Sequence, residues 1–275
     1  MAPMMLINGS ARGVVSPLDR GLAYGDGLFE SIRFVGAEAP LWSRHMQRLE
    51  EGCRRLRMPL PDNEQLWHEA CEASHDLPQS VVRITLTRGV GDRGYAPAAS
   101  PLLTRIVAAF APPSVNTESY SRGVRMRICE LRLAAQPLLA GIKHLSRLEQ
   151  VLARGEWSDP AIAEGLLRDV DGSVISATMA NLFAVIDSEL RTPVLDRCGV
   201  AGVARAEVLA ACPQTQIGQI SMKALLEAEE IFLTSSVRGI LPVQSLGDRN
   251  YAPGTITRKL QQHWHNLGFS MEQAG

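Results

Sequence analysis

The segment Gly141-Ile142-Lys143-His144-Leu145-Ser146-Arg147-Leu148-Glu149-Gln150-Val151-Leu152 places a lysine in an apolar stretch, between a predicted strand and a predicted helix. The chain has three lysines, and Lys223 and Lys259 fall on amphipathic helices where a solvated charge is ordinary. Lys143 differs, because burial among apolar residues lowers the pKa of an ammonium group and makes it a usable nucleophile or proton carrier. A lysine that lays its stem on the apolar surface and reaches water is the alternative that this segment alone leaves open.

Upstream of this segment, strand and helix patterns alternate. Residues 29–35 alternate apolar and polar side chains as a strand does, and residues 42–57 carry apolar side chains at helical spacing. Asp62 can cap the next helix, with Gln65 completing a capping box. Two runs of strand-forming residues follow, Val81 to Arg88 and Leu102 to Phe110.

A polar stretch with a Pro-Pro step, residues 111–122, then interrupts the pattern. Strands are predicted after it at 124–128, 166–169, 174–177 and 181–186, and helices at 145–154, 202–211, 221–228 and 255–267. Because strands and helices are mixed on both sides, we predict two α+β domains. The predicted boundaries are an N-terminal domain over residues 1–112, a linker over 113–121 and a C-terminal domain over 122–275.

Composition excludes several classes of protein. The 275 residues are 45% hydrophobic and 21% charged, with a net charge of −1, so the chain is neither disordered nor fibrous. No basic excess is available to neutralise phosphates, so we expect no nucleic-acid partner. No apolar run is long enough for a transmembrane helix, so we expect no membrane partner.

Cysteine and histidine usage indicates a reducing compartment and no metal. No C-x-x-C and no H-x-x-x-H pair occurs, so we expect no metal site. The N-terminal five residues lack a basic n-region, so we expect no signal peptide and a cytoplasmic location. We expect reduced, mostly buried thiols at Cys53, Cys71, Cys129, Cys198 and Cys212.

One motif invites a wrong interpretation. Gly89-Val90-Gly91-Asp92-Arg93-Gly94 matches the G-x-G-x-x-G pattern of dinucleotide sites and follows a predicted strand. Such a site needs a helix to begin at the motif, yet Pro97 and Pro101 follow and no helical pattern starts. We therefore predict a glycine-rich hairpin loop, in which Arg93 and Tyr95 could contact a carboxylate at the rim of a site.

Taken together, six segments resemble the class IV aminotransferase family, the fold-type IV pyridoxal-phosphate enzymes. They share order and spacing with that family over nearly the whole chain, and they are Asp19–Glu30, His45–Leu49, the Lys143 segment, Asn181–Phe183 with Gly202–Arg205, and Thr234–Val243. The resemblance implies a two-domain, D-amino-acid aminotransferase-like α+β fold with a C-terminal pseudo-barrel. It also implies pyridoxal 5'-phosphate as cofactor, a small-molecule substrate and a homodimer.

The same resemblance assigns roles to individual residues. Lys143 matches the lysine that bonds to the cofactor, and Arg48 matches the arginine that binds its phosphate. Val203 and Ala204 match a pair whose backbone N–H groups hold the phosphate at a helix start, a role that suits the free donors there. Ser236 matches a position whose hydroxyl reaches the phosphate.

Ser176 departs from the family pattern. The family usually has a glutamate five residues before the asparagine that corresponds to Asn181, and Ser176 stands at that position. The glutamate pairs with the cofactor's ring nitrogen, and a serine hydroxyl cannot hold a proton there as a carboxylate can. We therefore expect Ser176 to contact the cofactor while weakening its capacity to accept electrons.

Within the family, the segment that begins at Gly141 is most similar to that of the 4-amino-4-deoxychorismate lyases, and so is the loop of Arg93, Gly94 and Tyr95. The resemblance thus implies conversion of 4-amino-4-deoxychorismate to 4-aminobenzoate and pyruvate in folate biosynthesis. A D-amino-acid or branched-chain aminotransferase of the same fold is the nearest alternative. A non-catalytic domain that kept the fold is the alternative from another class, and Ser176 alone favours it.

Overall fold

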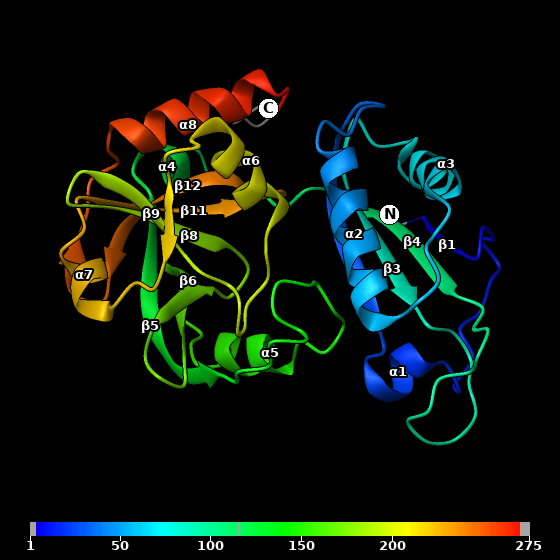
Figure 1. Cartoon of the computed structure of the whole chain (residues 1–275). Coiled ribbons are helices and arrows are strands. Elements are labelled where there is room, and N and C mark those ends of the chain that lie inside the picture. Colours follow the sequence, from blue (N-terminus) through cyan, green and yellow to red (C-terminus); the bar gives the residue numbers. More distant parts are fainter. Residues whose placement is uncertain (1–3, 115, 270–275) are drawn as a thin grey trace. The chain divides into compact units, whose positions relative to one another are not determined.

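The structure, a computed structural model, describes residues 4–114 and 116–269 (Figure 1). The chain forms two compact units. Unit 1 comprises the chain up to Pro112 together with Ile142–Ser146, and unit 2 comprises Pro113–Gly141 and the chain from Arg147 onward. The described residues leave out residues 1–3, which belong to the N-terminal segment that we expect not to be a signal peptide. They also leave out residue 115 of the expected linker.

Unit 1 is an antiparallel sheet with two helices on one face. The strands, in sheet order, are β1 (Met5–Ile7), β4 (Thr104–Phe110), β3 (Gln79–Thr87) and β2 (Gly27–Val35). The helices are α1 (Arg20–Tyr24), α2 (Trp42–Leu56) and α3 (Asn63–Ser74). Phe34 of β2 packs against Trp42 of α2 and Trp67 of α3, so both longer helices cover the same face. That face carries the buried side chains Ile32, Val82, Ile84 and Leu86, because alternate residues of a strand point the same way.

Local sequence explains where the helices of unit 1 begin and end. The carboxylate of Asp62 accepts hydrogen bonds from the backbone N–H groups of Glu64 and Gln65 at 2.9 and 3.1 Å, which confirms Asp62 as the cap of α3. The helix α2 ends at Arg57, which adopts a left-handed conformation with φ of 53°. Pro59 and Pro61 then prevent the helix from continuing.

Unit 2 is built on one nine-stranded sheet. Its strand order is β10 (Gln216–Gly218), β9 (Glu189–Pro193), β8 (Asn181–Ile186), β11 (Glu230–Ser235), β12 (Gly239–Leu246), β5 (Val124–Leu133), β6 (Ile162–Asp169) and β7 (Val174–Ala177), with β13 (Arg249–Asn250) paired to β12. The helices are α4 (Thr117–Ser121), α5 (Leu148–Arg154), α6 (Val203–Ala211), α7 (Met222–Leu226) and α8 (Thr255–Asn266). The sheet curls, since β7 at one end of the order contacts β8, and α8 lies along β12 and β11 (Figure 1).

Several elements differ from the sequence prediction, the expected linker, the helix after Lys143 and the strand β12 among them. The segment expected to be a linker holds α4 and belongs to unit 2. The helix predicted from residue 145 begins only at Leu148, because the backbone N–H of Leu145 is hydrogen-bonded to Gly27 of β2. The strand β12 was not predicted; it contains Pro242, which has no N–H to donate and ordinarily argues against a strand inside a sheet.

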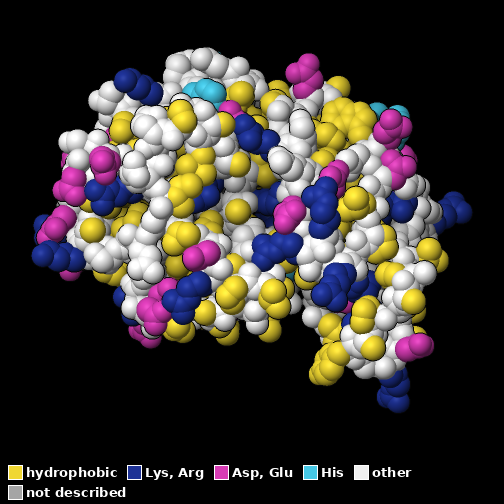
Figure 2. Space-filling view, viewed as in Figure 1, with side chains coloured by type: hydrophobic (Ala, Val, Ile, Leu, Met, Phe, Trp, Pro, Cys, Tyr) yellow, Lys and Arg dark blue, Asp and Glu magenta, His cyan; other side chains and the backbone are white. Residues whose placement is uncertain are grey.

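The distribution of charged side chains on the surface and the state of the cysteines agree with what the composition predicts. Figure 2 shows lysines and arginines interspersed with aspartates and glutamates over the visible face. All five cysteines are free, and Cys53, Cys129 and Cys198 are buried, as expected. Within residues 4–114 and 116–269, no helix combines the length and the apolar character that a membrane crossing requires.

Candidate active site

The lysine segment extends the edge of the sheet of unit 1. The backbone N–H of Phe29 donates to the carbonyl of Lys143 at 3.0 Å, and that of Leu145 donates to Gly27 at 2.9 Å. The half-buried Lys143 places its Nζ 4.2 Å from the centroid of the Phe29 ring, on the face of the sheet that the helices leave uncovered. The aromatic face attracts the ammonium group and fixes the lysine beside β2.

Two glycines of the Asp19–Glu30 motif make room for this pairing. Gly25 ends α1 in a left-handed conformation with φ of 69°, and a Cβ there would lie 2.5 Å from the hydroxyl of Ser146. A Cβ on Gly27 would lie 2.8 Å from the side chain of Leu145 and 2.4 Å from the carbonyl of Leu86. Side chains at these two positions would push the lysine segment away from β2.

Arg48 lies close to the same strand through a buried ion pair. Its Nε donates to Oε1 of Glu30 at 2.8 Å, and its Nη2 donates to Oε2. His45, one turn earlier on α2, places Nδ1 2.6 Å from Oε2 of Glu30. Sequence reasoning missed Glu30 and His45 as members of the site; the spacing of His45 and Arg48, three residues apart on one helix face, is the signal that could have revealed them.

Electrostatics link these groups. Burial raises the pKa of Glu30, but Arg48 and His45 outweigh it and bring the pKa down to about 2, so the carboxylate is ionised at neutral pH. The pKa of His45 is lowered by burial and further by the charges of Arg48 and Lys143, against the opposing effect of Glu30. His45 is therefore neutral at pH 7, and the charges of Arg48 and Lys143 act on one common imidazole.

In unit 2, a glycine and an asparagine shape the start of α6. Gly202 precedes the helix, and no side chain caps it. The side chain of Asn181 instead fixes the backbone that leads into the helix. Its Oδ1 accepts a hydrogen bond from the Gly202 N–H at 2.9 Å, and its Nδ2 donates to the Val200 carbonyl at 2.8 Å. The first two residues, Val203 and Ala204, are buried, with exposed fractions of 3% and 1%. Uncapped N–H groups at the positive end of a nine-residue helix suit an anion such as a phosphate.

Chain connectivity links this turn to the lysine segment. Gly141, two residues before Lys143, pairs with Val200, three residues before Val203. Its N–H donates to the Gly199 carbonyl at 2.9 Å, and its own carbonyl accepts from Ala201 at the same distance. The loop that leads into the lysine segment thus runs beside the loop that leads into α6.

The two predicted serines occupy different settings in unit 2. Ser176 is buried in β7, opposite Leu167 of β6. Ser236 is half-buried in the turn between β11 and β12, next to Ser235, whose hydroxyl accepts from the N–H groups of Val237 and Arg238 at 3.3 and 3.4 Å.

A buried carboxylate that sequence reasoning missed lies near Ser176 along the chain. Glu164 of β6 is fully buried and accepts hydrogen bonds from the hydroxyl of Thr178 and from the guanidinium of Arg238. Thr178 follows Ser176 by two residues. The carboxylate is thus committed to two protein partners, which satisfies an otherwise costly buried charge.

Arg93 and Tyr95 lie on the loop between β3 and β4 of unit 1. No helix follows Gly94, and β3 and β4 pair as an antiparallel hairpin, so the predicted hairpin loop is confirmed. Both side chains are exposed, and Tyr95 retains 85% of its accessible surface. The ring of Tyr95 lies 5.5 Å from that of Tyr24, centroid to centroid.

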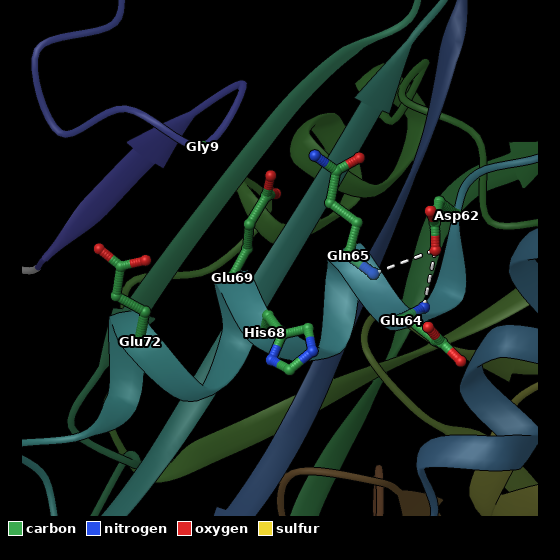
Figure 3. Close-up of a pocket in the computed structure, with 7 residues that line it drawn as sticks. All are labelled: Gly9, Asp62, Glu64, Gln65, His68, Glu69 and Glu72. Atoms are coloured by element: carbon green, nitrogen blue, oxygen red, sulfur yellow. Dashed lines mark hydrogen bonds between the residues drawn. The ribbon is translucent and has the colours of Figure 1, made fainter.

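A pocket elsewhere on unit 1 contains none of the predicted site residues. It is lined along α3 by acidic and polar side chains (Figure 3): Gly9, Asp62, Glu64, Gln65, His68, Glu69 and Glu72. Glu69 is already paired with Arg105 at 2.8 Å, and Asp62 caps the helix. Among the described residues, no group of three His, Cys, Asp or Glu side chains is arranged to hold a metal ion.

Comparisons with known proteins identify the family and several relatives of this chain. The sequence model of the family described as amino-transferase class IV matches residues 27–246. An aminodeoxychorismate lyase of Vibrio harveyi is 35% identical over 268 residues, which cover 94% of this chain and 98% of the relative. The crystal structure of 4-amino-4-deoxychorismate lyase from Pseudomonas aeruginosa superposes with a TM-score of 0.91 at 44% identity, covering 95% of this chain and 98% of that one.

The fold extends to more distant enzymes. The Escherichia coli branched-chain amino acid aminotransferase structure gives a TM-score of 0.86 at 22% identity, covering all of this chain and 97% of that one, and this likeness shows the fold alone. These neighbours confirm the predicted two-domain, fold-type IV α+β architecture. The family match spans most of the chain and includes the lysine segment, the Glu30–Arg48 pair and the start of α6, and the chain therefore belongs to the class IV aminotransferase family.

Proposed function

We propose that this chain is a pyridoxal 5'-phosphate-dependent lyase that converts 4-amino-4-deoxychorismate to 4-aminobenzoate and pyruvate, a step of folate biosynthesis. The observation that carries the proposal is the similarity over nearly the whole chain to two proteins named as this lyase, at 35% and 44% identity. The segment around Lys143 supports the same choice within the family. Fold alone would not, since the same fold serves different chemistries.

The cofactor would be held by the residues to which the resemblance assigns that role. In this proposal Lys143 bonds to the cofactor, while Arg48 and the first N–H groups of α6, at Val203 and Ala204, bind its phosphate. The chemistry of these donors fits: a guanidinium already oriented by Glu30, and an uncapped helix start behind a glycine whose Cβ would lie only 2.1 Å from Asn181. Ser236 adds a hydroxyl to the phosphate, and Ser176 contacts the ring nitrogen.

Lys143 would carry the proton in the reaction. The bound cofactor supplies an electron-withdrawing ring that acidifies the substrate carbon bearing the amino group. Once the substrate's amino group has taken its place on the cofactor, the Nζ of Lys143 would take the proton from that carbon, the C–O bond to the enolpyruvyl group would break, and the six-membered ring would become aromatic. Lys143 then returns a proton to the leaving group, which is released as pyruvate. Aromatisation makes the bond cleavage favourable.

Substrate carboxylates would be bound by the loop that carries Arg93 and Tyr95. A guanidinium binds a carboxylate with two parallel hydrogen bonds, and a phenol can add a third. Both side chains are exposed on the loop and therefore available to a ligand.

The proposal also includes a homodimer in the cytoplasm. The homodimer is inferred from the family resemblance. Five free cysteines fit a reducing compartment. We propose no nucleic-acid and no membrane partner, in keeping with the net charge of −1.

The test is to supply purified protein, loaded with pyridoxal 5'-phosphate, with 4-amino-4-deoxychorismate and to measure 4-aminobenzoate. The same protein is assayed in parallel with D-amino acids and branched-chain amino acids plus 2-oxoglutarate. Rapid 4-aminobenzoate formation with little amino-group transfer supports the lyase. Efficient amino-group transfer without 4-aminobenzoate would instead identify an aminotransferase.

A further inference from the structure

A buried arginine of the Asp19–Glu30 motif binds the loop of Arg93 and Tyr95. Arg20 is 5% exposed. Its Nη1 donates to the carbonyl of Gly94 at 3.0 Å, and its Nη2 donates to that of Tyr95 at 2.9 Å. A longer contact of 3.4 Å joins Nη1 to the carbonyl of Ala96. One guanidinium therefore holds three successive backbone carbonyls of the loop.

The guanidinium is itself fixed in place. The Nε of Arg20 donates to Oδ2 of Asp26 at 2.9 Å, and the guanidinium lies 5.0 Å from the centroid of the Tyr24 ring. The planar fork of arginine can bind the carboxylate with one edge and carbonyls with the other, which a lysine ammonium cannot do. The orientation of the loop backbone thus depends on a residue that is anchored outside the loop.

The loop is shaped to receive this arginine. A Cβ on Gly91 would lie 2.9 Å from Cδ of Arg20, so the loop backbone passes directly over the arginine stem. The backbone N–H of Arg20 also donates to the carbonyl of Gly89 at 2.8 Å. Tyr24, next to Arg20 in space, contacts Tyr95 through its ring. Both ends of the glycine-rich stretch are therefore held by α1.

We propose that Arg20 is a positioning residue that holds the loop over residues 89–96 in the conformation which presents Arg93 and Tyr95 to the substrate carboxylates. The substrate part of this inference rests on the proposed lyase function. It also explains why the glycine-rich motif precedes no helix: its glycines let the backbone pass close to Arg20.

Arg88 provides a matched control. It is 6% exposed, and its Nε donates to the same Oδ2 of Asp26 at 2.8 Å. Its remaining donors go to the carbonyls of Arg57 and Leu56 at 2.9 and 2.7 Å, at the end of α2. Replacing either arginine removes one ion pair to Asp26, but only the replacement of Arg20 releases the loop.

The experiment compares Arg20→Gln with Arg88→Gln in the holoenzyme by two measurements. The first is the rate of tryptic cleavage after Arg93, read by mass spectrometry of the fragments, without substrate. The second is the split between KM for 4-amino-4-deoxychorismate and kcat, at saturating cofactor. Losing hydrogen bonds from a charged donor predicts cleavage and KM about ten- to a hundredfold higher for Arg20→Gln, with kcat nearly unchanged. Arg88→Gln should match the wild type in both.

A second variant keeps the test decisive if Arg20→Gln does not fold. Gly91→Ala displaces the arginine stem from the loop side and should raise both quantities in the same direction. Equal cleavage and equal KM for the Arg20 and Arg88 variants would overturn the inference, as would faster cleavage with an unchanged KM. If the wild type makes no 4-aminobenzoate, the proposed function fails, and the cleavage rates alone decide whether Arg20 holds the loop.

Discussion

Arg48 of α2 and Glu30 of β2 form a bidentate ion pair, in which Nε of Arg48 donates to Oε1 of Glu30 at 2.8 Å and Nη2 donates to Oε2. The carboxylate is almost fully buried, whereas the arginine side chain keeps 13% exposure. Glu30 therefore fixes the direction in which the arginine can bind a further anion. Since His45 shares the same carboxylate, one strand residue orients two side chains of α2.

Replacing Glu30 by glutamine should weaken binding of pyridoxal 5'-phosphate. The amide keeps the shape of the side chain but loses the charge that orients Arg48. Because hydrogen bonds to charged groups are worth about 1.5–3 kcal/mol, the affinity should fall roughly ten- to a hundredfold. The measurement is a titration of cofactor-free protein followed by absorbance. Glu51→Gln, at an exposed carboxylate of the same helix, is the control and should bind as the wild type does.

The same variant predicts a pH dependence of stability. The pKa of Glu30 is lowered to about 2 in the folded protein, against about 4.3 for a glutamate in an unfolded chain. A lowered pKa means that the ionised group stabilises the fold fully above the unfolded value, and that this contribution is lost as the pH falls toward the folded value. Urea unfolding should therefore show a constant stability gap between wild type and Glu30→Gln above about pH 5 that narrows below it. A gap that stays constant down to pH 3 would contradict this.

Reduction with borohydride should attach the cofactor to Lys143. The protein loaded with pyridoxal 5'-phosphate should be yellow and should lose that absorbance on reduction, and peptide mass spectrometry should locate the label. Lys223 and Lys259 are exposed on α7 and α8 and serve as internal controls that should stay unlabelled. A label on either of them, with Lys143 unmodified, would refute the assignment.

Gly202→Ala should impair the phosphate site at the start of α6. The new Cβ would lie 2.1 Å from Oδ1 of Asn181, which accepts the Gly202 N–H, so the first turn must shift. Cofactor affinity should fall about tenfold or more, as expected for the loss of one hydrogen bond to a charged group. Gly218→Ala in the same unit meets no atom within 4 Å and should leave the affinity unchanged. Equal affinities for the two variants would show that α6 does not bind the phosphate.

Ser176→Glu should raise amino-group transfer relative to lyase activity. Transfer stores negative charge on the cofactor ring, and a nearby carboxylate keeps the ring nitrogen protonated, because opposite charges favour the charged form. The lyase reaction depends less on this, since its electrons leave with the enolpyruvyl group. Both rates are measured on wild type and variant at matched cofactor saturation. An unchanged ratio, or a shift toward the lyase, would mean that Ser176 does not control the ring nitrogen.

Sequence periodicity predicted the elements that are long and amphipathic. The strand over residues 29–35, the helix over 42–57 and the cap at Asp62 all correspond to observed elements. The five-residue helices α1 and α4 were missed, whereas α7, of the same length, was predicted within 221–228. Strand β12 was missed because Pro242 contradicts local strand preference, while pairing with two neighbours stabilises the strand regardless.

The site was predictable only in part, and for a physical reason. Lys143 stands out locally, as one of three lysines and set in an apolar stretch. Glu30 and Arg20 do not, since their importance comes from partners that are distant along the chain, such as the carbonyls of Gly94 and Tyr95. The roles of Arg48, Ser176 and the start of α6 toward the cofactor stay predictions from the resemblance.

The segment Ile142–Ser146 belongs to unit 1, although the chain on both sides of it belongs to unit 2. Neither unit is therefore encoded by one continuous stretch of the gene. A fragment of residues 1–112 would lack the segment Ile142–Ser146, in which Lys143 and Leu145 are hydrogen-bonded to the start of β2. Unit 1 is therefore complete only when the lysine segment, which lies within the sequence of unit 2, is present.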